Sequence, residues 1–315
     1  MIPAIPGLDQ ISYLTNSSMV NVDFLPPHLI VLGGSYIGLE FAQLYRRFGS
    51  GVTVIESAPR LIAREDEDVS RAIAEIFRAE NIDIRVGSKV VAVKKSDANI
   101  VATIETEGAK SEIEGSHLLL AVGRRPNTDD LGLEHAGVIT DSRGYIEVDD
   151  QLRTNVPGIW ALGDCNGRGA FTHTSYNDFE IVAANLLDND QRRVTDRVTA
   201  YALYIDPPLG RAGMTEAEVR KSGRPALIAT MAMEDVSRAY EKGETKGFMK
   251  ILVDRETKQI LGASLLGLSG DEVIHCILDT MYAKAPSTVL QRAMHIHPTV
   301  SEFIPAMMEE LVPLQ

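Results

Sequence analysis

The sequence predicts an α/β protein that continues into a C-terminal α+β domain, and two observations support this architecture. A short apolar strand, a glycine-rich turn, a helix and a second strand follow one another between residues 28 and 57, which is the order of a β-α-β unit. From about residue 198 two strands joined by a polar turn precede helices that run to the end, so sheet and helices are segregated along the chain.

Length and composition indicate a folded protein of two or three domains. The chain has 315 residues, of which 44% are apolar and 24% charged. No apolar stretch approaches the roughly 20 residues of a membrane span, and the N-terminus lacks signal-peptide features. We therefore expect a cytoplasmic protein with no membrane partner. The net charge of -13 argues against a nucleic-acid partner, because such proteins need clustered Lys and Arg.

Only two cysteines occur, Cys165 and Cys276. Their wide separation gives neither a zinc motif nor a CxxC redox motif, so we predict no metal site and interpret each thiol as a packed residue.

The β-α-β unit carries a dinucleotide-binding signature. Ile30 to Leu32 form the first strand and "GVTVIE" the second. The helix between them is predicted from apolar residues at helical spacing, namely Ile37, Phe41, Leu44 and Phe48. Gly33, Ser35 and Gly38 occupy the three positions of G-x-G-x-x-G, where small residues let backbone amides approach a pyrophosphate. The predicted cofactor site also includes the intervening residues Gly34, Tyr36 and Ile37. A plain tight turn is the alternative.

Glu56 ends the second strand about 20 residues after the turn, where a carboxylate can accept hydrogen bonds from both ribose hydroxyls. A carboxylate there favours NADH over NADPH because it repels a 2′-phosphate. Arg60 and Arg64 follow closely and could either bind that phosphate or lie solvated beside the next helix, so both NADH and NADPH remain open. With a helix around "DVSRAIAEIFRAEN", three strands and the apolar run "HLLLAVG", residues 27–143 are predicted to form one Rossmann-like NAD(P)-binding domain.

A second candidate site follows this domain. A buried strand, Ile159 to Leu162, is predicted to end at Gly163 and Asp164, and "AFTHTSYNDFEIVAANLL" is predicted as a helix that begins beside them. Taken alone, the Gly-Asp pair also fits a simple turn.

Six motifs now lie in an ordered series: "GGSYIGLEFA", "LLLAVGRRPNT", "TNVPGIWALGD", "PPLGRAGMTE", "ILGASLLG" and "HPTVSE". This series resembles the flavin-dependent pyridine nucleotide-disulfide oxidoreductases. The resemblance implies that Gly123 and Arg124 lie near the junction of the two nucleotide-binding domains, and that Asp164 hydrogen-bonds the FAD ribitol while Gly163 gives close backbone access. It also implies that residues 198–315 form the dimerisation domain of a homodimer, and that His297 and Glu302 are an acid/base pair for a dithiol.

The sequence departs from that family in lacking the first glycine-rich β-α-β unit and the redox-active CxxxxC. We therefore expect a longer natural enzyme, with residues 1–26 as a linker or remnant of the FAD domain and residues 144–197 as its return segment. The predicted function is the C-terminal portion of an enzyme that passes hydride from NAD(P)H to FAD and on to a disulfide and a substrate. The substrate, a small molecule or a disulfide, is left open. The alternative is a catalytically inactive, dimeric nucleotide-binding fragment.

The C-terminal motif suggests how His297 would work. Pro298 is predicted to begin a helix with Thr299 and Ser301 in its first turn, and Glu302 is close enough along the chain to accept a hydrogen bond from His297. Such a carboxylate fixes the imidazole tautomer, which suits a group that takes a proton and returns it. A helix-capping histidine with a surface glutamate is the alternative.

Apolar residues at helical spacing in "VIHCILDTMYA" are candidates for the dimer interface, with the domain's own core as the alternative for each of them: Ile274, Ile277, Leu278 and Met281.

Overall fold

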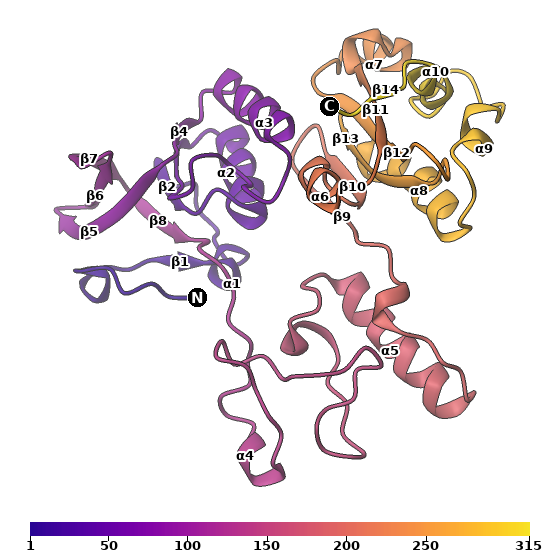
Figure 1. Cartoon of the computed structure of the whole chain (residues 1–315). Helices are drawn as coiled ribbons and strands as arrows, with labels where there is room; N and C mark the ends of the chain where they lie inside the picture. Colours follow the sequence, from indigo (N-terminus) through magenta and orange to yellow (C-terminus); the bar gives the residue numbers. More distant parts are fainter. The chain divides into compact units, whose positions relative to one another are not determined.

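The computed structural model describes residues 1–315, which divide into two compact units. Unit 1 joins residues 1–122 to residues 199–315, and unit 2 comprises residues 123–198 (Figure 1). The strands are β1 (Leu14–Thr15), β2 (His28–Leu32), β3 (Gly51–Ile55), β4 (Asp83–Arg85), β5 (Ser88–Ser96), β6 (Asn99–Thr106), β7 (Ala109–Gly115), β8 (His117–Leu120), β9 (Ala200–Leu203), β10 (Leu209–Gly213), β11 (Ala226–Ala232), β12 (Phe248–Asp254), β13 (Ile260–Leu266) and β14 (Val312–Pro313). The α-helices are α1 (Asn16–Met19), α2 (Tyr36–Phe48), α3 (Glu67–Ala79), α4 (Leu133–Ala136), α5 (Thr172–Leu187), α6 (Glu216–Ser222), α7 (Ser237–Lys242), α8 (Gly270–Tyr282), α9 (Thr288–Gln291) and α10 (Phe303–Glu309). None of these helices has the length and apolar character that crossing a membrane requires.

A five-stranded parallel sheet forms the centre of the N-terminal half of unit 1, in the order β1-β8-β2-β3-β4. Successive residues of β2 point to opposite faces. Leu29 and Val31 pack in a core with α2 and α3, while Ile30 and Leu32 pack in a second core with β5 and β6. Because both faces are covered, the apolar run is continuous, as expected for a parallel strand.

The second face is covered by an antiparallel sheet of β5, β6 and β7. The sequence predicted β5 and β6 but not β7, "AKSEIEG", an edge strand whose side chains are mostly exposed. Only Ile113 and Gly115, near one end, are covered, so this strand lacks the apolar alternation on which sequence prediction depends.

Helix α2 forms where it was predicted, but its apolar stripe was misassigned. Leu39, Ala42 and Tyr45 are buried, whereas Leu44 and Phe48 are 43% and 63% exposed. The small residue Gly38 brings the helix close to the sheet and selects this other face.

The C-terminal half of unit 1 contains a six-stranded antiparallel sheet, in the order β14-β11-β12-β13-β10-β9. Strands β12 and β13 are the predicted pair joined by a polar turn. Helices α7, α8 and α10 contribute to a core with residues of this sheet, including Met249, Ile251 and Leu265. This is the predicted α+β arrangement.

The two halves of unit 1 also share a core. Leu203, Leu209 and Leu266 of the antiparallel sheet belong to the same cluster as residues of α2 and α3. Apolar packing thus continues from α2 and α3 into the C-terminal sheet.

Unit 2 has less regular structure, and one predicted strand is absent from it. Residues Ile159 to Leu162 make a single bridge, between Trp160 and Arg153, instead of a strand. A strand needs a neighbouring strand to pair with its backbone groups, and no longer ladder forms here. Helix α5 confirms the predicted helix after Gly163 and Asp164.

The C-terminal helix α10 begins at Phe303, so the prediction that Pro298 starts a helix is wrong. Residues 298–302 form turns in which the N–H groups of Phe303 and Ile304 donate to the carbonyls of Val300 and Ser301. The helix can begin only after these turns are complete.

Two of the four dimer-interface candidates lie in the core of their own domain. Ile274 and Ile277 are 4% and 0% exposed, and the partly buried Leu278 and Met281 pack against the same core. Ile274 and Ile277 therefore belong to the core of their own domain, which was the alternative to a place in the dimer interface.

We predict that Ile277→Ala lowers the free energy of unfolding by about 2–5 kcal/mol, because it leaves a cavity in this core. Val289→Ala, at a position that is 52% exposed on α9, should change it by less than about 0.5 kcal/mol. Urea unfolding followed by circular dichroism at one fixed protein concentration would compare the two variants. Equal losses would contradict the core assignment.

Candidate functional site

The glycine-rich turn lies at the carboxyl end of β2 and is closed by two backbone approaches that only glycine permits. Gly33 has φ +114°, and a Cβ atom there would lie 2.4 Å from the carbonyl oxygen of Ala121. A Cβ atom on Gly38 would lie 2.0 Å from the carbonyl oxygen of Gly33. The first turn of α2 is therefore pressed against the strand that precedes it, as the fingerprint predicts.

The N-terminus of α2 faces out of this turn. Ser35 is the N-cap residue, yet its hydroxyl caps no backbone N–H. The first N–H groups of a helix have no partner within the helix, and its dipole favours negative charge at this end. A pyrophosphate fits this arrangement.

Glu56 follows β3 and supports the turn directly. Its Oε2 accepts the Gly34 N–H at 2.7 Å, and its Oε1 accepts the Ala58 N–H at 2.7 Å. The predicted residues Gly34 and Glu56 are thus brought together at the carboxyl edge of the sheet. Each carboxylate oxygen can accept more than one hydrogen bond, so the group can still receive a hydroxyl donor.

The two arginines near Glu56 differ in their environment. The Nη2 atom of Arg60 donates to the carbonyls of Ala63 and Glu65, at 3.1 and 3.2 Å, so this side chain holds its own loop together. Arg64 is exposed.

In unit 2, the structure brings Arg124, predicted near the junction of the two nucleotide-binding domains, into contact with Asp164, predicted at the flavin. Arg124 Nη1 lies 3.1 Å from Asp164 Oδ2 and also donates to the carbonyl of Ala170. Gly163 has φ +77°, and a Cβ atom there would lie 2.9 Å from the Ser175 hydroxyl. Gly123, with φ +123°, directly precedes Arg124. Both charged side chains are about half exposed, so the Asp164 carboxylate is accessible.

Asp178 on α5 fixes this turn, and sequence reasoning missed it. The residue is 2% exposed, and its Oδ2 accepts the Gly163 N–H at 2.9 Å and the Asn166 side-chain amide at 2.8 Å. Its other oxygen is paired with Arg197. The sequence did contain a signal for this role, namely an acidic residue in the second turn of the helix that follows the Gly-Asp turn.

His297 and Glu302 form the hydrogen bond predicted from their spacing. The Nδ1 atom of His297 lies 3.0 Å from Glu302 Oε2, and the imidazole is 75% exposed while the carboxylate is 17% exposed. Glu302 is held in turn by Thr299, whose N–H donates to Oε1 and whose hydroxyl accepts the Glu302 N–H. The Nε2 side of the ring is thereby presented outward.

Both cysteine thiols are partly buried and donate to a carbonyl three residues earlier, Leu162 for Cys165 and Val273 for Cys276. Burial raises the pKa of each thiol, which disfavours the reactive thiolate.

Comparison with protein families decides the classification. The profile described as pyridine nucleotide-disulphide oxidoreductase matches residues 1–178, and the profile for the dimerisation domain of the same family matches residues 199–308. The chain belongs to the pyridine nucleotide-disulphide oxidoreductases. Members of this family are FAD-dependent and use NAD(P)H.

Individual members of the family are similar over nearly the whole chain. The chain is 36% identical to the probable pyridine nucleotide-disulfide oxidoreductase RclA of Escherichia coli, covering 96% of this chain and 68% of RclA. It is 36% identical to the mercuric reductase of Streptomyces lividans, covering 95% of this chain and 63% of that enzyme. The mitochondrial dihydrolipoyl dehydrogenase of Dictyostelium discoideum is 32% identical, with 95% and 62% covered. The chain thus spans about two thirds of the length of these relatives.

Solved structures of the family show the same architecture. The Cu(II) complex of HOCl-induced flavoprotein disulfide reductase RclA from Escherichia coli matches with a TM-score of 0.92 at 35% identity, covering 98% of this chain and 71% of that one. LpdA from Mycobacterium tuberculosis matches with a TM-score of 0.87 at 26% identity, covering 94% and 64%.

We predict that Asp178→Ala destabilises unit 2 by about 3–5 kcal/mol, because it leaves the largely buried Arg197 guanidinium without its carboxylate and the buried Gly163 N–H without its acceptor. Asp164→Ala, which removes a half-exposed ion pair, should cost less than about 1 kcal/mol. Trp160 is the only tryptophan and lies in unit 2, so its fluorescence during urea unfolding reports on this unit. Comparable losses in the two variants would show that Asp178 does not hold the turn.

Proposed function

We propose that this chain forms the NAD(P)H-binding and dimerisation portions of a flavin-dependent disulfide-type oxidoreductase, together with part of its flavin site. The observation that carries the proposal is the glycine-rich turn, where Gly33 and Gly38 permit two close backbone approaches and α2 presents its N-terminus. When bound, the two cofactors supply hydride and electron transfer. The domain boundaries 1–26, 27–143, 144–197 and 198–315 and the cytoplasmic location stay predictions.

In this proposal the pyrophosphate lies against the start of α2, at Ser35, Tyr36, Ile37 and Gly38. Gly33 and Gly34 shape the turn, since their N–H groups donate to the Ile55 carbonyl and to the Glu56 carboxylate. Glu56 accepts hydrogen bonds from the ribose hydroxyls. Gly163 and Asp164 face the flavin ribitol, with Gly123 and Arg124 beside them. The contact between Arg124 and Asp164 supports this last assignment, because it holds the carboxylate in place.

His297 is proposed as the acid/base group, with Glu302 orienting it. The hydrogen bond to Nδ1 leaves Nε2 to take a proton from a thiol and return it. The exposure of the imidazole supports an action on a group outside its own domain, which in this family architecture is a disulfide of the partner subunit. The terminal electron acceptor is a small molecule or a disulfide.

NADH is the proposed cofactor in preference to NADPH. The Glu56 carboxylate would repel a 2′-phosphate. Arg60 donates to the carbonyls of Ala63 and Glu65 in its own loop, so it is not placed to bind that phosphate. Isothermal titration of the purified chain with NADH tests the proposal, and the absence of binding would refute it.

A catalytically inactive, dimeric nucleotide-binding fragment is the second candidate. The observation that favours it is the cysteine content, since the two thiols lie at residues 165 and 276 and form no redox pair. Titration with FAD, followed by flavin absorbance and NADH-dependent bleaching of that absorbance, separates the two candidates.

We predict that Glu56→Gln weakens NADH binding by about 10- to 100-fold, the equivalent of one or two hydrogen bonds to a charged acceptor. NADPH binding should fall less, because the substitution also removes a repulsive charge. Parallel titrations with the two nucleotides measure the difference. Equal losses for both would mean that Glu56 acts only through its bonds to Gly34 and Ala58.

We also predict that the chain sediments as a dimer at low micromolar concentration, with twice the 34.4 kDa mass of one chain. The dimerisation-domain match supports this expectation. A constant monomer mass from low to high micromolar concentration would contradict it.

A further inference from the structure

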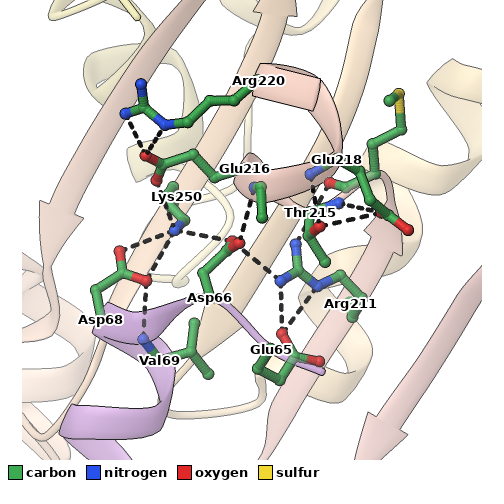
Figure 2. A network of polar contacts seen from close by, with 12 residues as sticks. Glu65, Asp66, Asp68, Val69, Arg211, Thr215, Glu216, Glu218, Arg220 and Lys250 are labelled. Atoms are coloured by element: carbon green, nitrogen blue, oxygen red, sulfur yellow. Dashed lines mark hydrogen bonds and ion pairs between the residues drawn. The ribbon is translucent and has the colours of Figure 1, made fainter. Parts of the chain in front are cut away.

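Two cations of the C-terminal sheet are almost completely buried against acidic residues at the start of α3. Arg211 on β10 and Lys250 on β12 are each 1% exposed (Figure 2). Arg211 contacts Glu65 through Nε and Nη2 and lies 3.2 Å from Asp66, while Lys250 contacts Asp66 at 3.0 Å and Asp68 at 2.8 Å. The network thus joins residues separated by about 145 to 185 positions in the chain.

The network has two branches that lead to different places. The Lys250 branch runs to Asp68 in the first turn of α3 and to Glu216 in the first turn of α6. The Arg211 branch runs through Glu65 to Tyr201 on β9, whose hydroxyl donates to Glu65 Oε1 at 2.6 Å. Only the second branch continues toward the glycine-rich turn.

Tyr201 meets Tyr36, the first residue of α2. Their rings pack edge to face with centroids 5.6 Å apart, and their hydroxyls are hydrogen-bonded. A carboxylate can only accept, so the single hydroxyl hydrogen of Tyr201 points to Glu65 and the Tyr201 oxygen is left to accept from Tyr36. Burial raises the pKa of Tyr36 to about 12, and burial together with Glu65 raises the pKa of Tyr201, so both hydroxyls are protonated at neutral pH.

Glu65 is also linked to the other side of the turn through the backbone. Its N–H donates to the carbonyl of Ile62 at 2.8 Å, and the Ile62 N–H donates to the carbonyl of Gly34 at 2.9 Å. Glu65 therefore reaches the turn at both Gly34 and Tyr36. The link to Gly34 runs through the Glu65 backbone, and the link to Tyr36 runs through the Glu65 carboxylate and Tyr201.

We infer that Tyr201 and Arg211, in the dimerisation part of the chain, are positioning residues that hold the glycine-rich turn ready for the nucleotide by acting through Glu65 and Tyr36. The inference rests on the proposed nucleotide-binding function of this turn. A helix N-terminus binds an anion more tightly when its N–H groups are already oriented, because ordering them on binding costs free energy and so weakens the affinity. Arg211 fixes Glu65, Glu65 fixes Tyr201, and Tyr201 fixes the start of α2.

The test is Tyr201→Phe, which removes one hydroxyl and keeps the ring. The matched control is Tyr204→Phe, the same chemical change three residues later at a side chain that is 70% exposed. Hydrogen exchange of the ligand-free chain, measured by mass spectrometry, should become at least threefold faster in peptides covering residues 33–38 and 56–66 for Tyr201→Phe only. The Kd for NADH should rise about 3- to 10-fold for the same variant.

If the network only stabilised the packing of the two halves of unit 1, breaking either branch would accelerate exchange in the turn. The inference instead predicts that Lys250→Met, which breaks the other branch, accelerates exchange at residues 66–70 and 216–220 and leaves residues 33–38 as in the wild type. Tyr36→Phe breaks the same link from its other end and replaces Tyr201→Phe if that variant does not fold. The double variant Tyr36→Phe/Tyr201→Phe should bind NADH no more weakly than whichever single variant has the higher Kd, because both substitutions break the same link.

Wild-type exchange in the turn of folded Tyr201→Phe would overturn the inference, as would strictly additive losses in the double variant. If the wild-type chain binds no NADH, the proposed function fails, while the exchange data still decide whether Tyr201 positions the turn.

Discussion

The close approach of helix α2 to strand β2 is the constraint on which the candidate nucleotide site depends. The absence of side chains at Gly33 and Gly38 lets the helix begin directly at the sheet edge, where the proposed pyrophosphate would meet its first N–H groups. Glu56 then reaches the Gly34 amide, because β2 and β3 are adjacent and parallel and end at the same level. A larger residue at either glycine would separate the helix from the strand and move every one of these groups.

The second constraint is electrostatic. Arg211 and Lys250 are buried where the C-terminal sheet meets α3, and buried cations are tolerated only when paired. Replacing such pairs by apolar residues can be neutral for stability, so we interpret the network as a device that specifies how the C-terminal sheet meets the start of α3. Leu203, Leu209 and Leu266 pack in the same core as residues of α2 and α3. The hydrophobic effect of this packing favours association of the two halves but is not directional, whereas the ion pairs are.

The residues of unit 2 that we propose to face the flavin are held in place by a different interaction. Asp178 is a buried acceptor for the Gly163 amide, the Asn166 amide and Arg197, so one carboxylate fixes the turn that presents Asp164. The buried Asp178 therefore fixes the backbone of the turn, while the accessible Asp164 carboxylate makes only a half-exposed ion pair with Arg124. A rigid support with an accessible acceptor suits the proposed position of this turn beside the flavin.

Local sequence determined the parts of this protein whose causes are local. Sequence predicted the glycine-rich turn, the strands β2, β3, β12 and β13, the helix α5 and the hydrogen bond between His297 and Glu302. Turns, periodicity and short-range hydrogen bonds depend on neighbouring residues, which is why these features could be predicted. Tertiary structure decided which face of α2 is buried, that Ile159 to Leu162 pair at one position only, and that α10 begins at Phe303. It alone brought Glu65 to Arg211 and Tyr201 to Tyr36, since a single sequence does not reveal which distant side chains will share a buried, low-dielectric site where an unpaired charge is too costly to keep.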